Sequence, residues 1–186
     1  MNGLIDRRSL LKHLTIATCA LTAPALPGIP SVANAAAIGE KSLSFQSLHT
    51  GENLKVTYWA QGTYLPDSCK QIDYLLRDWR TDDIRLIDRR LFDLLYDLRR
   101  MLGTTQPFQV ISGYRSPKTN ATLAARSRGV AKRSLHLKGK AIDVSLADRD
   151  LRHLRKAALA LKAGGVGYYP RTGFVHLDTG RVRRWG

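Results

Sequence analysis

Two segments in which apolar and polar residues alternate, 43–48 and 53–59, predict a pair of β-strands. The residues between them, His49-Thr-Gly-Glu52, favour a turn, so we expect the two strands to form a hairpin. A short apolar run over 108–111 predicts another strand. Further along, 141–146 and 174–178 show the same alternation, and 134–143 as a whole is interpreted as extended.

Apolar residues that recur with the period of a helix predict four helices between these strands. The first begins near Pro66, a residue suited to the first helical turn, and the second runs from a cap at Asp88 to a stop at Gly103. A short helix is expected over 117–125, followed by a basic loop over 126–133, and a longer helix over 148–161 before Gly164-Gly165. The apolar positions of the first helix are Ile72, Leu75, Leu76 and Trp79.

Strands and helices are mixed in this order rather than strictly alternating, which predicts an α+β fold. A mainly antiparallel sheet flanked by helices accounts for the pattern. The length of the chain beyond its first 35 residues favours one domain, with no internal repeat and no long linker.

The first 35 residues have the features of an export signal. Asp6-Arg-Arg-Ser-Leu-Leu-Lys12 is followed by a short apolar run and by Ala33-Asn-Ala35, where small residues suit a signal peptidase. The paired arginines fit the twin-arginine route, and the run is interrupted by prolines and too short for a membrane helix. We therefore predict a removable signal over 1–35, a periplasmic domain over 36–186 and no stable membrane anchor. Cys69 is then the only cysteine left, which excludes an intramolecular disulfide.

The chain is strongly basic, with 30 Lys and Arg against 15 Asp and Glu and a formal net charge of +15. Such a charge attracts polyanions. An exported protein seldom meets nucleic acid, and none of the familiar nucleic-acid-binding modules is present, so nucleic acid is not an expected partner. The cell wall, whose stem peptides carry free carboxylates, is the better candidate. Solvated arginines on helix faces account for part of the excess.

Two histidines and two carboxylates lie in the segments 134–143 and 174–178. With Ile142, Val144 and Leu146 directed to the core, Asp143 lies on the opposite face of its strand. Imidazole and carboxylate groups are ligands that zinc prefers, and a catalytic site uses three of them with one position open for water. Either segment alone is more often structural, but together they predict a zinc site at His136, Asp143 and His176.

Two neighbouring features have two interpretations each. Asp178 lies on the same face of its strand as His176, so it could act as the general base or could orient the histidine through its second nitrogen. The run Gly164-Gly-Val-Gly-Tyr-Tyr-Pro170 lacks the context of a phosphate-binding loop. It could let backbone approach a peptide, with Tyr168 or Tyr169 lining the cleft and Tyr168 preferred, or it could simply begin a strand with packed tyrosines.

The motif Ser134-x-His-x-x-Gly-x-Ala-x-Asp143, with Val175-His176 some thirty residues later, resembles the zinc D-Ala-D-Ala peptidase superfamily, which includes lysostaphin-type enzymes and the hedgehog domain. Further segments narrow the resemblance to its murein endopeptidase K family of periplasmic peptidoglycan hydrolases, over about 43–185. These segments are Leu48-His-Thr-Gly-Glu52, Ile111-Ser-Gly-Tyr-Arg-Ser116, Ala125-Arg-Ser-Arg-Gly-Val-Ala131 and Ala163-Gly-Gly-Val-Gly-Tyr-Tyr-Pro170.

The resemblance implies a hedgehog-like fold, zinc as cofactor, and His136, Asp143 and His176 as its ligands. It also implies that Arg115 holds the substrate peptide or its developing oxyanion, and it aligns Ser134 with the serine that opens the first zinc motif, a candidate substrate contact. One departure concerns the acid that many members carry three residues before the last histidine, because this chain has Gly173 there.

These observations lead to one hypothesis with two alternatives. The hypothesis is an exported zinc metallopeptidase that hydrolyses peptide cross-links in peptidoglycan, with Asp178 as the candidate base. The first alternative is a D-alanyl-D-alanine carboxypeptidase. The second is a non-catalytic zinc-containing wall-binding domain, in which Asp178 would be a fourth ligand. The sequence leaves open the oligomeric state and which cross-link bond is cleaved.

Overall fold

The computed structural model describes residues 39–127 and 130–186. The predicted export signal over 1–35, with Cys19, lies outside this part of the chain, as do residues 128–129 of the predicted basic loop. In the part described, no helix combines the length and the apolar character that crossing a membrane requires.

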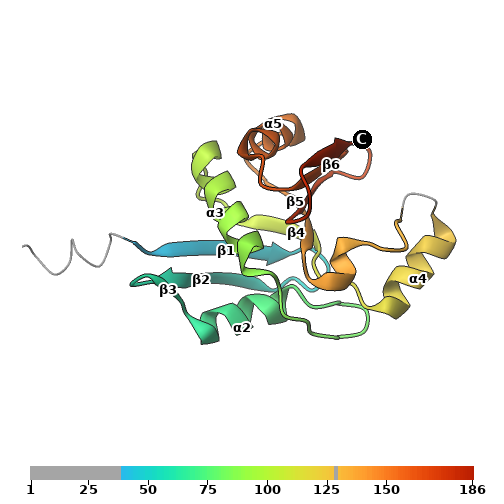
Figure 1. Ribbon diagram of the computed structural model, residues 1–186, viewed down its shortest axis with the longest axis horizontal. Coiled ribbons are helices and arrows are strands. Elements are labelled where there is room, and N and C mark those ends of the chain that lie inside the picture. Colours follow the sequence, from blue (N-terminus) through green and yellow to red (C-terminus); the bar gives the residue numbers. More distant parts are fainter. Residues whose placement is uncertain (1–38, 128–129) are drawn as a thin grey trace, which may run out of the picture.

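The fold is an α+β domain built on one eight-stranded sheet (Figure 1). Its strand order is β3-β2-β1-β4-β5-β7-β6-β8. Only β1 with β4 and β6 with β8 pair in parallel, so the predicted mainly antiparallel sheet is confirmed. The strands are β1 Lys41–Ser47, β2 Asn53–Ala60, β3 Thr63–Tyr64, β4 Phe108–Ser112, β5 Ala141–Ser145, β6 Gly165–Tyr169, β7 Phe174–Asp178 and β8 Arg183–Trp185.

The helices cover the sheet where the apolar periodicity placed them. They are α2 Pro66–Leu75, α3 Arg89–Leu102, α4 Pro117–Arg126 and α5 Leu151–Leu161, with a short 3₁₀ helix, η1, at Leu135–Lys138. Helix α2 contacts β2, whereas α3 and α5 contact each other and reach β1, β6 and β7. Helices α2 and α3 are joined by an ion pair between Asp73 and Arg89, and Figure 1 shows α3 and α5 close together.

Local capping explains the bounds of α3. The Asp88 side chain accepts a hydrogen bond from the backbone N–H of Arg90, and Gly103 ends the helix with a φ of 59°, so both predicted ends are confirmed. The predicted hairpin is also present, with β1 and β2 paired antiparallel.

Two elements differ from their prediction. Helix α2 ends at Leu75, so Trp79 lies beyond it in a loop, where its ring stacks on His49 with a centroid distance of 4.2 Å. The segment before β5 is not extended, because residues 135–138 form η1. A single 3₁₀ turn is too short to leave a periodic pattern in the sequence.

Candidate metal centre

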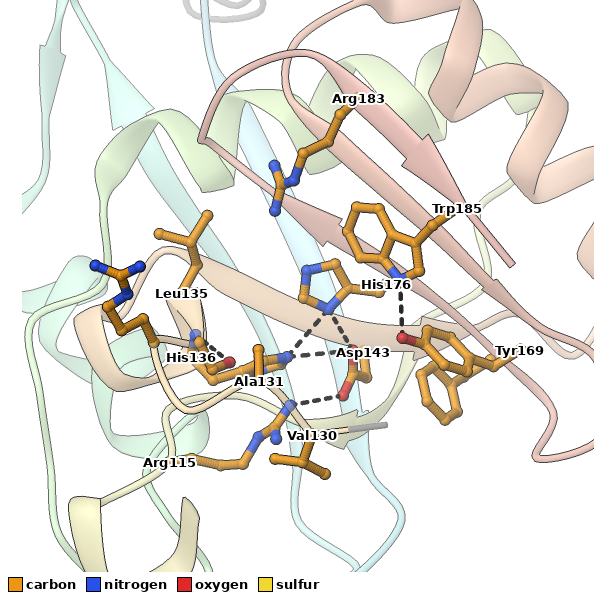
Figure 2. Close-up of a pocket in the computed structure, with 13 residues that line it drawn as sticks. Arg115, Val130, Ala131, Leu135, His136, Asp143, Tyr169, His176, Arg183 and Trp185 are labelled. Carbon is orange, nitrogen blue, oxygen red and sulfur yellow. Dashed lines mark hydrogen bonds and ion pairs between the residues drawn. The ribbon is translucent and has the colours of Figure 1, made fainter. Parts of the chain in front are cut away.

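Three side chains from separate parts of the chain meet at one edge of a cavity (Figure 2). Asp143 of β5 is paired in register with His176 of β7, and His136 reaches them from η1. The Oδ1 atom of Asp143 lies 2.8 Å from Nδ1 of His176 and 3.2 Å from Nε2 of His136. The two ring nitrogens are 3.1 Å apart. All three side chains are buried, and their ligand atoms lie within 4.8 Å of one another.

The strand alternation places Asp143 as the sequence predicted. Ile142 and Val144 on either side of it join the hydrophobic core, whereas Asp143 itself lines the cavity. A strand directs consecutive side chains to opposite faces, so the core pattern by itself fixes the direction of the carboxylate.

The turn of η1 directs His136 toward the strands. The hydroxyl of Ser134 caps the turn by accepting a hydrogen bond from the backbone N–H of His136 at 3.3 Å. Gly139 ends it with a φ of 63°, and a Cβ atom there would come within 2.5 Å of the carbonyl oxygen of Leu86. Gly139 is therefore required both by its backbone angle and by the close approach of the loop before α3.

Hydrogen bonds on the outer side of each imidazole fix its orientation. Nδ1 of His136 lies 2.6 Å from the carbonyl oxygen of Gly113, which can only accept, so this nitrogen carries the proton and Nε2 keeps a lone pair. Nε2 of His176 lies 3.1 Å from Oδ2 of Asp178 and its Nδ1 lies 2.8 Å from Oδ1 of Asp143, and these two carboxylates outweigh burial and raise the pKa of His176. Nε2 of His136 and Nδ1 of His176 thus both face Asp143, and a cation bound there would replace the proton on Nδ1 of His176.

The protonation states suit a cation. Burial lowers the pKa of His136, which favours the neutral imidazole. Burial alone would raise the pKa of Asp143, but the charges and hydrogen bonds of His136 and His176 outweigh it and hold that pKa well below its usual range. An ionised carboxylate and two imidazole nitrogens that face it form a donor set that fits zinc, with three protein ligands and one side open to the cavity.

The cavity beside this centre has a volume of about 290 Å³ and is basic. Three arginines line it, and Asp143 is the only carboxylate among the described residues of its wall. Its other described lining residues are Val130, Ala131, Ser134, Leu135, Tyr169, Phe174 and Trp185, and the arginines are Arg115, Arg133 and Arg183.

Arg115 follows β4 and lies beside Asp143. Its Nη2 is 3.4 Å from Oδ2 of Asp143, and its buried Nε has no hydrogen-bond partner in the described part of the chain. The preceding Gly113 makes this placement possible, because a Cβ atom on it would collide with the backbone of Leu76. The cavity therefore contains a buried guanidinium that still has a donor to offer.

Asp178 is placed differently from a general base. Its carboxylate is fully buried and does not line the cavity. It accepts hydrogen bonds from the backbone N–H groups of Gly165 and Gly180, from both Nη atoms of Arg183, and from Nε2 of His176. These donors outweigh the effect of burial and hold the pKa of Asp178 far below its usual range. The carboxylate thus contacts the outer nitrogen of His176. This is the geometry expected of the second interpretation, in which Asp178 orients the histidine.

The preference for Tyr168 over Tyr169 has to be corrected. Tyr168 packs against the hydrophobic core, and the Arg155 guanidinium lies 4.9 Å from its ring centroid. Tyr169 lines the cavity and its hydroxyl accepts a hydrogen bond from Nε1 of Trp185 at 2.8 Å. The register of β6 against β7 decides this, because Gly167 opposite His176 lies on the same face as Tyr169.

Gly173 lies in the turn between β6 and β7, with a φ of 80°. It does not line the cavity. Arg183 and Trp185 of β8 line it instead. Neither could be found from the sequence, because β8 is a three-residue strand without a distinctive pattern.

Comparison with known proteins agrees with this geometry. The family model described as peptidoglycan L,D-endopeptidase MepK matches residues 35–185. The chain is 46% identical over 174 residues to the peptidoglycan L,D-endopeptidase MepK of Escherichia coli K12, covering 94% of this chain and 95% of the relative. It is 44% identical over 144 residues to a probable MepK of Haemophilus influenzae, covering 77% of each. The chain therefore belongs to the MepK family of the zinc D-Ala-D-Ala peptidase superfamily.

Proposed function

We propose that this protein is an exported zinc peptidase that hydrolyses peptide cross-links in peptidoglycan, with the L,D-endopeptidase activity for which its relatives are named. The observation that carries the proposal is the convergence of His136, Asp143 and His176, with one nitrogen of each imidazole facing Asp143 beside an open basic cavity. Peptide strands with free carboxylates are suited to a cavity lined by three arginines.

His136, Asp143 and His176 would hold the zinc ion. Bound there, zinc supplies Lewis acidity that polarises a scissile carbonyl and lowers the pKa of water. The protein holds its ligands ready for this task, because the carbonyl of Gly113 and the carboxylate of Asp178 each fix one imidazole from behind.

Arg115 and Ser134 are the proposed substrate contacts. Arg115 lines the cavity with its guanidinium beside Asp143, where it can bind a carbonyl oxygen that gains negative charge or a substrate carboxylate. The Ser134 hydroxyl already accepts a bond from the His136 N–H, and its own proton is available for a peptide carbonyl. Tyr169 replaces Tyr168 as the proposed aromatic contact.

For Asp178 we propose a positioning role rather than proton transfer. Five hydrogen bonds occupy its two oxygens, so it has no free lone pair with which to accept a proton from water. The same observation bears on the wall-binding alternative, which needs Asp178 as a fourth ligand. The carboxylate faces the outer nitrogen of His176 instead, and the metal-binding group in the described residues has three members.

The test combines metal analysis with digestion of intact cross-linked sacculi. The purified mature protein is expected to bind one zinc ion and to convert cross-linked muropeptides to uncross-linked ones. His136→Ala should lose both properties, whereas Lys156→Ala, an exposed site on α5, should keep both. Release of free D-alanine without loss of cross-links would identify the carboxypeptidase alternative. Zinc binding without any cleavage would favour the non-catalytic one.

Periplasmic location belongs to the same proposal. It is supported by the twin-arginine pattern of residues 1–35 and by the presence of the proposed substrate outside the cytoplasm.

A further inference from the structure

A second hollow, which we call the basic groove, adjoins the metal cavity. It has a volume of about 690 Å³ and is formed by α4, η1 and the loop before α3. Residues 130–138 separate the two hollows, since Ala131 and Arg133 line the metal cavity and Lys132 between them lines the groove. Figure 1 shows α4 and the segment that contains η1 at the same end of the molecule.

The floor of the groove is apolar. It consists of the side chains of Tyr114, Pro117, Ala121, Ala124, Ala125 and Leu137. The three alanines lie on one helix, so the surface offers room for small methyl groups rather than for a large ring. Such a floor is suited to an extended chain with short side chains.

The rim of the groove is positively charged. Arg85, Lys132 and Lys138 line it and are exposed, and none of them forms an ion pair with a described residue. No carboxylate lines the groove in the part of the chain that the structure describes. Unpaired cations around an apolar floor favour a ligand that carries more than one carboxylate.

A buried acceptor adds a second requirement. Asn120 lines the groove and is only 4% exposed. Its Nδ2 donates to the carbonyl oxygen of Ala131 at 3.3 Å, but its Oδ1 has no hydrogen-bond partner among the described residues. A buried oxygen without a partner is unfavourable, so a ligand that supplies an N–H group there gains from it. A peptide backbone provides such donors.

We propose that the basic groove binds the second, uncleaved stem peptide of the peptidoglycan cross-link, an anionic, alanine-containing peptide. This rests on the proposed function, because a cross-link joins two stems and the peptide in the metal cavity brings the other within reach. The stem's carboxylates meet Arg85, Lys132 and Lys138, its methyl groups cover the α4 alanines, and a backbone N–H bonds Asn120. The groove thereby distinguishes cross-linked substrate from a short peptide that fills only the metal cavity.

The decisive variant reverses two rim charges, Lys132→Glu with Lys138→Glu. Its control is Lys55→Glu with Lys156→Glu, which makes the same change in net charge at exposed, unpaired sites on β2 and α5. With zinc-loaded protein and purified cross-linked muropeptide dimers, the groove variant should raise KM about tenfold with a much smaller change in kcat. The control should stay within about twofold of wild type in KM.

A binding measurement separates this inference from the proposed activity. Calorimetric titration with an uncross-linked stem tetrapeptide needs no hydrolysis. The Kd of the tetrapeptide should rise about tenfold in the groove variant and in Ala121→Glu, but not in the control. If the tetrapeptide binds in this way while sacculi stay intact, the groove stands and the activity fails. If sacculi are cleaved but KM and Kd respond equally in groove and control variants, the groove proposal is overturned. Equal, lysine-dependent binding of a duplex oligonucleotide would overturn it as well.

Discussion

Oδ2 of Asp178 lies 3.1 Å from Nε2 of His176, on the side of the imidazole that faces away from the metal centre. The same carboxylate forms two hydrogen bonds with the guanidinium of Arg183, at 2.7 and 3.0 Å. A chain of contacts thus runs from β8 through Asp178 to His176, a proposed metal ligand. In the proposed site these contacts hold the ring in one orientation, which a lone histidine on a strand could not maintain.

Asp178→Asn tests this relationship. The amide keeps the shape of the side chain but removes the charge that holds the His176 N–H, so zinc affinity should fall by about 10 to 100-fold. Competition with a chromogenic chelator measures this directly, without any substrate. A general base would give the opposite pattern, with kcat reduced and zinc affinity unchanged.

Arg183→Gln should reproduce part of that effect. The substitution removes both bonds to Asp178 and leaves a buried carboxylate with fewer donors, so zinc binding and folding stability should both decline. Arg184→Gln is the matched control, because Arg184 is exposed on the same strand. Equal zinc affinity in the two variants would contradict a positioning role for Arg183.

Arg115→Ala should separate catalysis from metal binding. Loss of a donor to the developing oxyanion typically reduces kcat by a factor on the order of 10² to 10³. Zinc affinity should not weaken, because Nη2 of Arg115 lies 3.4 Å from Oδ2 of Asp143. The substitution therefore removes a positive charge that would repel the zinc ion. Arg115→Lys should recover only part of the rate, since an ammonium group cannot bind in the planar, two-pronged manner of a guanidinium. A zinc-depleted Arg115→Ala protein would show that the residue acts on the site itself.

Most of the fold and the grouping of His136, Asp143 and His176 could be predicted from the sequence, and the reasons are local. Ile142 and Val144 fix the direction of Asp143, and the caps Asp88 and Gly103 fix the ends of α3. Two further features could not be predicted, because tertiary structure decides them. Whether Tyr168 or Tyr169 reaches the cavity depends on the register of β6 against β7, and the occupied lone pairs of Asp178 depend on Arg183 five residues later in a folded turn. Neither relationship leaves a pattern along the chain.

Gly113→Ala should damage the metal centre from a distance. A Cβ atom at this position collides with the backbone of Leu76, and the displaced carbonyl is the one that bonds Nδ1 of His136. We expect a loss of stability of about 1 to 3 kcal/mol together with weaker zinc binding. Urea unfolding in the presence of a chelator isolates the first effect, and metal competition the second. Ser112→Ala, one residue earlier, is the control and should change neither by a comparable amount.

Acid should destabilise the protein partly through Asp88. Burial alone would raise its pKa, but hydrogen bonds from Arg90 and Thr179 outweigh it and lower the pKa to about 2. A carboxyl group whose pKa is lower in the folded state stabilises the fold above its unfolded pKa of about 4, and this contribution disappears as pH falls through the folded value. Because the partner Arg90 is exposed and solvent screens the pair, the contribution is about 1 kcal/mol, lost between about pH 4 and pH 2. Urea unfolding across this range, with chelator present, should show a shallower decline for Asp88→Asn than for wild type, and parallel curves would refute the assignment.

The predicted export signal over 1–35 can be tested independently of the catalytic site. The twin-arginine route reads the arginine pair itself, so Arg7→Lys with Arg8→Lys keeps the charge of the segment but should block export and leave the precursor in the cytoplasm. Cell fractionation followed by mass measurement of the protein distinguishes precursor from mature chain. Lys12→Arg, a substitution of the same kind outside the pair, should be exported normally. Normal processing of the double variant would show that another export route is used, without affecting the argument for the metal centre.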